Sequence, residues 1–182
     1  MTIPNQLTLL RIILVPVFVL VFYLPVGWNN YLACTIFILA ALTDMLDGYL
    51  ARKLNQTSSL GAFLDPVADK LMVAVALVLI VQQAPSIELA LPAAVIIGRE
   101  ITVSALREWM AEIGARKKVA VSILGKIKTI AQMVALGFLI FHDALFGIPV
   151  FMIGLILLYT AAILTLISMF QYLMAAWPRL KE

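Results

Sequence analysis

The chain has 182 residues, of which 64% are hydrophobic and 13% are charged. A typical soluble domain is about 45–50% apolar and about 25% charged, so this composition excludes an ordinary soluble domain. The net charge of +3 does not indicate a nucleic-acid partner, because the basic residues are dispersed among apolar segments and form no basic stripe. Attraction to anionic membrane lipids explains them better. The length predicts a single domain over residues 1–182.

Six apolar segments follow one another along the chain, each near the length of about 20 residues that a membrane-spanning helix requires. They lie near residues 6–25, 31–51, 65–82, 89–111, 123–142 and 149–172. Within lipid every backbone polar group must be hydrogen-bonded inside the chain, so the segments should be helices. The sequence therefore predicts an all-α membrane protein built as a bundle of six transmembrane helices.

Basic residues gather in only some of the connections between these segments. Seven lie after the second segment, after the fourth segment and in the C-terminal tail, namely Arg52, Lys53, Arg116, Lys117, Lys118, Arg179 and Lys181. The other three connections contain no Lys or Arg. Cytoplasmic loops carry the excess of basic residues, so we expect both termini to face the cytoplasm. Most charges within the segments lie toward the same side, which predicts a polar cavity that opens to the cytoplasm.

Two aspartates stand at the end of the second segment. Asp44, Asp47, Gly48, Ala51 and Arg52 follow one another at offsets i, i+3, i+4, i+7 and i+8. These offsets place all five residues on one helical face. That face combines two carboxylates, two residues with almost no side chain and one cation. The small residues would let a bulky ligand approach the backbone closely.

The start of the third segment again places a small residue and two carboxylates on one helical face. Gly61, Asp65 and Asp69 are spaced by four residues and share a helical face. Pro66 suits the first turn of a helix, where its missing N–H has no partner to lose. If the two faces meet, the sequence predicts a site with four carboxylates.

An unpaired charge in the middle of a spanning helix costs roughly 2.5–3.5 kcal/mol, so four aspartates need compensation. A hard divalent cation with oxygen ligands would supply it, and Asp44, Asp47, Asp65 and Asp69 could together hold one or two ions. The ligand type favours Mg²⁺ or Mn²⁺, and we expect two ions. The absence of Cys pairs and of His near the motif argues against zinc. The alternative is an ion network with Arg52, Lys53 and Lys70, which would not explain the glycines.

Together the two halves form the pattern Asp-x-x-Asp-Gly-x-x-Ala-Arg, eight residues, then Gly-x-x-x-Asp-x-x-x-Asp. This pattern resembles the signature of the CDP-alcohol phosphatidyltransferases, and all eight fixed positions are filled within 26 residues. The stretches 3–11, 98–100 and 125–129 further resemble one branch of that family, the bacterial phosphatidylglycerophosphate synthases. The resemblance covers essentially the whole chain and implies a bacterial inner-membrane enzyme.

The resemblance implies that CDP-diacylglycerol donates a phosphatidyl group to sn-glycerol 3-phosphate, giving phosphatidylglycerophosphate and CMP. Asp69 would be the catalytic base and would therefore be only partly committed to the metal. The residues expected to contact CDP-diacylglycerol are Asn5, Thr8, Asp44, Gly48, Ala51, Arg52 and Gly61. The donor would enter sideways from the membrane lipids. Homodimerisation is a further expectation from the family.

An acceptor with a dianionic phosphate calls for cations, and arginine suits bidentate contact with phosphate. The candidates are Arg99, Arg107, Arg116 and Lys126. Each has another interpretation, since Arg99 could pair with Glu100 or Glu108, and Arg116 could serve only to set the topology. His142 and Asp143 lie at the outer side and are assigned no chemistry.

Two rival functions remain open from the residues alone. The first keeps the chemistry and changes the acceptor to serine, inositol phosphate or phosphatidylglycerol. The second is a small cation transporter that uses the aspartates as an ion path. A transporter would need polar residues that continue into the outer half of the spans, and that half offers almost none.

Overall fold

The computed structural model describes the backbone of residues 3–54, 59–114, 123–144 and 147–180. Within these ranges the described side chains exclude those of residues 3–4, 47–52, 54, 59–60, 62, 123–126 and 178–180. For five predicted site residues the structure therefore describes only the helical backbone and not the side chain. These are Asp47, Gly48, Ala51, Arg52 and Lys126. Arg116 lies outside the described backbone as well.

The described part of the chain folds into six helices and is all-α, as the sequence predicted. The helices are α1 (Ile3–Phe22), α2 (Asn29–Leu54), α3 (Ser59–Gln83), α4 (Ile87–Glu112), α5 (Ile123–Phe141) and α6 (Val150–Leu180). One expectation about α3 was wrong. The helix begins at Ser59, well before the predicted start, so Pro66 lies inside the helix and not in its first turn. Neighbouring helices and local adjustment allow proline inside a membrane helix.

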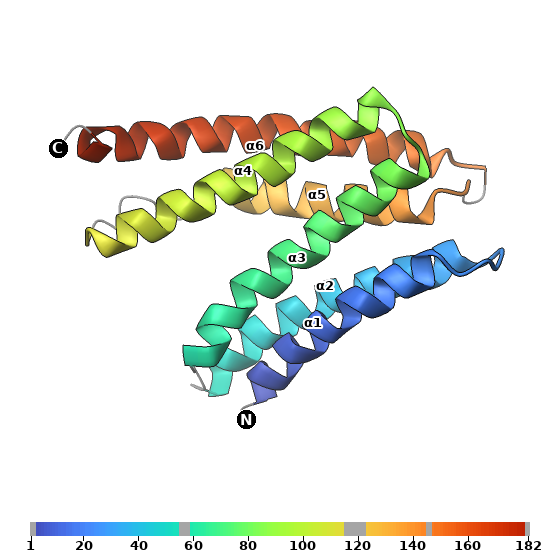
Figure 1. Cartoon of the computed structure of the whole chain (residues 1–182), viewed down its shortest axis with the longest axis horizontal. Coiled ribbons are helices and arrows are strands. Elements are labelled where there is room, and N and C mark those ends of the chain that lie inside the picture. Colours follow the sequence, from blue (N-terminus) through green and yellow to red (C-terminus); the bar gives the residue numbers. More distant parts are fainter. Residues whose placement is uncertain (1–2, 55–58, 115–122, 145–146, 181–182) are drawn as a thin grey trace.

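The helices form two groups of three (Figure 1). In the first group α1 packs against both α2 and α3, and in the second group α6 packs against both α4 and α5. Contacts of α3 with α4 and α5, and of α2 with α5, join the two groups. Both chain termini, the end of α2, the start of α3 and the end of α4 lie at one end of the bundle (Figure 1). The turns from α1 to α2 and from α3 to α4 lie at the opposite end.

Every helix contributes apolar side chains to one core. At least one large residue from each helix is no more than 2% exposed, as seen for Phe18, Phe37, Leu77, Ile96, Leu136 and Leu158. Other large apolar side chains point outward, among them Leu20 at 69% exposed and Phe170 at 65% exposed. An apolar outer surface of this extent indicates a protein that meets lipid.

The α5–α6 pair is closely packed at Gly154. A Cβ atom at this position would lie 3.0 Å from Leu139 Cγ and 3.2 Å from the carbonyl oxygen of Ala135. Small residues permit such close approach of helices in membranes. The contact holds α5 firmly against α6, and both helices carry polar side chains of the site described below.

Four helices in the described part of the chain are long and apolar enough to cross a membrane. They are α1, α2, α4 and α6, with qualifying stretches Asn5–Phe22, Asn29–Leu46, Ile87–Glu112 and Val150–Trp177. In α5 the apolar stretch Ile127–Phe141 is shorter. Helix α3 carries Asp65, Asp69 and Lys70 within its first half. The chain thus contains several helices suited to a membrane.

Candidate active site

Asp44 on α2 is held by a cation from α1. Arg11 has only 2% of its side chain exposed, and its Nη1 donates a hydrogen bond to Asp44 Oδ1 at 2.5 Å. The Asp44 side chain keeps 47% exposure, so one of its faces stays accessible. Charge-assisted bonds of this kind are about twice as strong as neutral ones. Sequence reasoning had assigned Arg11 no role, although a lone arginine in an apolar segment already suggested a buried partner.

Asp65 on α3 also has a partner on α1. The hydroxyl of Thr8 donates to Asp65 Oδ1 at 2.6 Å, and Thr8 is fully buried. Asn5, one turn earlier on α1, is buried as well. Thr8 and Asn5 were predicted to contact the nucleotide part of the donor. The structure places the Thr8 hydroxyl against an aspartate of the predicted metal site, and contact of Thr8 and Asn5 with the nucleotide stays a prediction.

Asp44 and Asp69 border one small space. A cavity of about 10 Å³ is lined by both aspartates and by Arg11, with Ala40, Ala41, Met72 and Met133 completing it. The second and third helices therefore bring two of the four predicted carboxylates to one cavity, whereas Asp65 is not part of its lining. Among the described side chains, no three of His, Cys, Asp and Glu lie close enough to hold a metal, and Asp47 is outside that set.

The described carboxylates nevertheless suit a hard divalent cation by their chemistry. Each carboxylate offers two oxygens and about four acceptor positions. One oxygen of Asp44 and one of Asp65 accept a single bond from α1. Each of these carboxylates therefore keeps oxygen lone pairs for another ligand. Oxygen donors of this kind are those that Mg²⁺ and Mn²⁺ prefer.

A larger cavity of about 280 Å³ lies beside the aspartates, where α3, α4, α5 and α6 meet. Asp69 and Met133 border this cavity as well as the small one, so the two spaces are neighbours. Its polar lining consists of Asp69, Lys70, Arg99, Glu100, Arg107, Lys128, Thr129, Gln132 and Tyr172. Four of these nine side chains are cations and two are carboxylates, so the lining has net positive charge.

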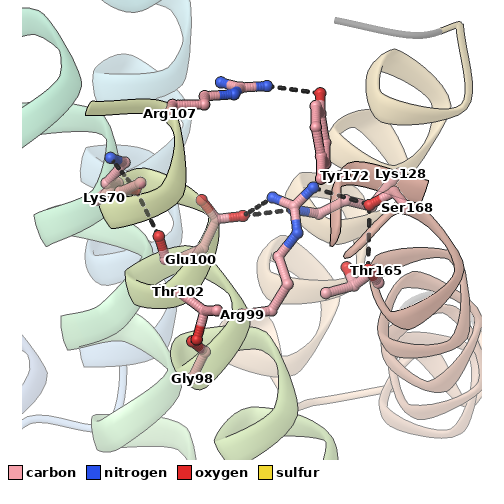
Figure 2. A network of polar contacts seen from close by, with 11 residues as sticks. Lys70, Gly98, Arg99, Glu100, Thr102, Arg107, Lys128, Thr165, Ser168 and Tyr172 are labelled. Carbon is pink, nitrogen blue, oxygen red and sulfur yellow. Dashed lines mark hydrogen bonds and ion pairs between the residues drawn. The ribbon is translucent and has the colours of Figure 1, made fainter. Parts of the chain in front are cut away.

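Glu100 is the centre of the polar network in this cavity (Figure 2). Its Oε1 accepts a hydrogen bond from Arg99 Nη1 at 2.9 Å and another from Lys128 Nζ. The side chains of Arg99 and Lys128 are only 8% and 5% exposed. Arg99 also donates from Nη2 to the Ser168 hydroxyl at 2.8 Å, and Ser168 donates to the carbonyl of Thr165. The network therefore joins α4, α5 and α6.

Arg107 belongs to the same wall of the cavity but is more exposed. Its Nη2 donates to the hydroxyl of Tyr172 at 2.6 Å, and its guanidinium carbon lies 5.0 Å from the centre of that ring. Figure 2 shows Arg107 beside the hydroxyl end of the Tyr172 side chain and Arg99 near its other end. Lys70 of α3 lies across the cavity and donates to Ser104. The guanidinium of Arg107 remains available to a ligand because one nitrogen suffices for the tyrosine.

Two of the four cations predicted for the acceptor phosphate, Arg99 and Arg107, line the cavity. The alternative for Arg99, an ion pair with Glu100, is confirmed at the same time. The sequence analysis named Glu100 only as a possible partner of Arg99 and assigned no site role to Lys128, Gln132, Ser168 or Tyr172. Their signal was the presence of polar side chains inside apolar helices, which are expensive there and usually functional.

Comparison with known proteins decides the family. A model of the CDP-alcohol phosphatidyltransferase family matches residues 1–174. The chain belongs to the CDP-alcohol phosphatidyltransferases. The family signature ends at Asp69, the charged residue that lines both cavities in the described part of the chain.

Curated members of this family include similar chains from two bacteria. The proteins from Escherichia coli (strain K12) and from Shigella flexneri serotype 5b (strain 8401) are each 57% identical to this chain over 174 residues. Each match covers 96% of this chain and 94% of the relative. Both relatives are named CDP-diacylglycerol–glycerol-3-phosphate 3-phosphatidyltransferase.

Proposed function

We propose that this chain is a membrane enzyme that transfers the phosphatidyl group of CDP-diacylglycerol to sn-glycerol 3-phosphate, giving phosphatidylglycerophosphate and CMP. The family match and the names of relatives that are 57% identical over nearly the whole chain support the reaction. The observation that carries the proposal is the position of Asp69. It borders the small cavity that Asp44 also lines, here called the carboxylate cavity. It also borders the larger cavity whose lining has net positive charge, here called the cationic cavity.

The reaction needs one proton transfer and one exchange of phosphorus–oxygen bonds. The terminal hydroxyl oxygen of glycerol 3-phosphate forms the new bond to the lipid-linked phosphorus. The bond from that phosphorus to the CMP oxygen breaks, and its electrons leave with CMP. Asp69 accepts the hydroxyl proton, because its carboxylate lies where the two cavities meet and a general base must reach the reacting hydroxyl.

The divalent metal would be held by the four aspartates of the signature, Asp44, Asp47, Asp65 and Asp69. Bound there, Mg²⁺ or Mn²⁺ would neutralise the donor pyrophosphate and stabilise the entering and leaving oxygens. The chain itself orients two of the carboxylates through Arg11 and Thr8. Such support from a second layer of residues fixes ligand geometry and is a usual part of metal sites. Gly48, Ala51, Arg52 and Gly61 stay predictions for contact with the donor.

The cationic cavity would receive the phosphate of the acceptor. Arg107 keeps guanidinium nitrogens beyond the one that bonds Tyr172, and arginine matches phosphate geometry well. Arg99 and Lys128 add positive charge behind it, partly balanced by Glu100. Arg116 and Lys126 remain candidates outside the described side chains. A cavity of about 280 Å³ suits a small, polar acceptor such as glycerol phosphate.

Turnover by the purified protein tests the reaction. With CDP-diacylglycerol, glycerol 3-phosphate and Mg²⁺ we expect CMP release, which chelation should stop and added Mg²⁺ or Mn²⁺ should restore. Serine, inositol phosphate and phosphatidylglycerol should be tested in parallel as acceptors. Faster turnover with one of these three would contradict the proposed acceptor while keeping the chemistry. Metal flux in proteoliposomes without CMP release would contradict the chemistry itself.

We also infer that all six helices cross a bacterial inner membrane, with the termini and the polar cavity at the cytoplasmic side. The positive-inside rule supports this orientation, as does the location of both termini at one end of the bundle (Figure 1). The chain has a single cysteine, Cys34, so a Cys34→Ser background allows site-directed labelling.

An impermeant thiol reagent should label Lys53→Cys only in inside-out vesicles and Asp143→Cys only in right-side-out vesicles. Labelling of both positions from the same side would contradict the six-span arrangement. The homodimer expected from the family can be examined on the same detergent-purified protein by its mass in solution.

A further inference from the structure

Gln132 on α5 is a buried polar residue that faces the large cavity. Its side chain is 4% exposed and belongs to the cavity lining. Among the described residues its Oε1 has no hydrogen-bond partner. A buried acceptor without a partner costs about 1–3 kcal/mol, so a native protein retains one only where something compensates. The cavity beside Gln132 is the place from which a ligand would reach it.

The other polar groups of the cavity already have roles. Arg99 also keeps a buried nitrogen without a partner, but Glu100 and Ser168 hold its guanidinium. The hydroxyl of Tyr172 accepts a hydrogen bond from Arg107. Thr129 is exposed and has an interaction of its own. Gln132 is therefore the buried, uncharged side chain in the described lining whose polar end is open to a ligand.

The position of Gln132 along α5 matches the geometry of the acceptor. Lys128 lies four residues earlier, on the same helical face and in the same cavity. Met133, the next residue, borders the small cavity of Asp44 and Asp69. Glycerol 3-phosphate has its phosphate at one end, its attacking hydroxyl at the other and an unreacted hydroxyl between them. The cations suit the first group and Asp69 the second, which leaves the middle hydroxyl for a neutral partner.

We propose that Gln132 determines acceptor specificity by forming a hydrogen bond with the unreacted middle hydroxyl of glycerol 3-phosphate. The proposal rests on the proposed function and adds to it the group that recognises the acceptor's carbon chain. A hydroxyl can both donate and accept, so the amide can pair with it through its oxygen. A site built to bond a hydroxyl discriminates against an analogue that lacks it, because the protein group is then left unpaired.

The test combines a change in the protein with a change in the substrate. The analogue 3-hydroxypropyl phosphate keeps the phosphate and a terminal hydroxyl but lacks the middle hydroxyl. We expect the wild-type protein to prefer glycerol 3-phosphate in kcat/KM by about tenfold or more, as one hydrogen bond predicts. Gln132→Leu should lose about that factor with glycerol 3-phosphate and change little with the analogue. The preference should therefore nearly disappear.

Each outcome of this experiment has a distinct meaning. An equal loss with both acceptors would overturn the proposal, since it would show that Gln132 packs the helix or binds water and does not touch the middle hydroxyl. A wild-type protein that uses neither acceptor would contradict the proposed function instead. The ratio of the two rates does not depend on the amount of folded enzyme in a preparation.

Two further variants complete the design. Gln132→Met replaces the amide with an unbranched apolar chain of similar length and should lose the preference as Gln132→Leu does. Gln171→Leu makes the same replacement at an exposed position on α6 and should keep the wild-type preference. Retention of the preference by Gln132→Met would overturn the proposal even if Gln132→Leu failed to fold.

Discussion

The two groups of helices carry two different kinds of polar site. In the α1–α3 group, Asp44, Asp65 and Asp69 come from one short stretch of sequence, and single bonds from α1 orient Asp44 and Asp65. In the α4–α6 group, a network around Glu100 joins side chains that lie up to 69 residues apart. The first site is a local motif that can be recognised in the sequence from residue spacing at the period of an α-helix. The second exists only because three helices converge.

This difference suggests a division of labour. The aspartate group would carry the chemical step, and the cationic group would bind the acceptor. Variants in the first should lower kcat, whereas variants in the second should raise the KM for the acceptor or destabilise the bundle. Asp69 borders both cavities, so substitution of Asp69 is the strongest test of this division between chemistry and acceptor binding.

The largest effect is expected for Asp69→Asn. Asparagine keeps the size of the side chain but cannot accept the acceptor's proton, so kcat should fall by roughly 10²–10⁴-fold. CMP release measures the loss, while membrane insertion and thermal unfolding should stay near wild type. Asp143→Asn, an exposed position after α5, is the matched control and should keep full activity. Full turnover by Asp69→Asn would contradict the assignment of Asp69 as the base. It would also contradict the proposal that Asp69 links the site of the chemical step to the acceptor site.

The next effect is on stability and concerns Glu100→Gln. The change leaves Arg99 and Lys128 buried without their shared counter-charge, and breaking a buried pair in this way costs up to about 3–5 kcal/mol. We expect a clear drop in the thermal unfolding temperature in detergent. Glu88→Gln, in the exposed first turn of α4, should leave that temperature unchanged. An unchanged melting temperature for Glu100→Gln would show that the network contributes nothing to holding α4, α5 and α6 together.

The smallest effect is expected for Tyr172→Phe. It removes the hydroxyl that holds Arg107 and keeps the ring, so the loss is one hydrogen bond. The KM for glycerol 3-phosphate should rise by about two- to tenfold while the KM for CDP-diacylglycerol stays the same. Tyr159→Phe, on the same helix and outside the cavity lining, serves as the control. A rise in the donor KM instead would place Arg107 on the donor side and undo the proposed division.

Much of the fold could be predicted because it follows from composition. Each apolar stretch near the required length proved to be helical, and two of the four aspartates predicted to form one site, Asp44 and Asp69, border a common cavity. The start of α3 could not be predicted. The residues around Gly61 and Pro66 contain weak helix formers, and a proline usually marks a helix start. The helix nevertheless begins at Ser59, since propensity along the chain is a weak guide to where a helix starts.

The sequence by itself determined the helical class, the membrane character and the aspartate motif, because these depend on residue type and on spacing within one or two adjacent helices. Only the tertiary structure decided the partners. Arg11 reaches Asp44 across a helix pair, Arg99 reaches Ser168 on α6, and Gln132 faces a cavity with its oxygen unpaired among the described residues. The physical reason is that a buried polar group must find its partner in three dimensions, and periodicity along one helix says nothing of what the neighbouring helix presents.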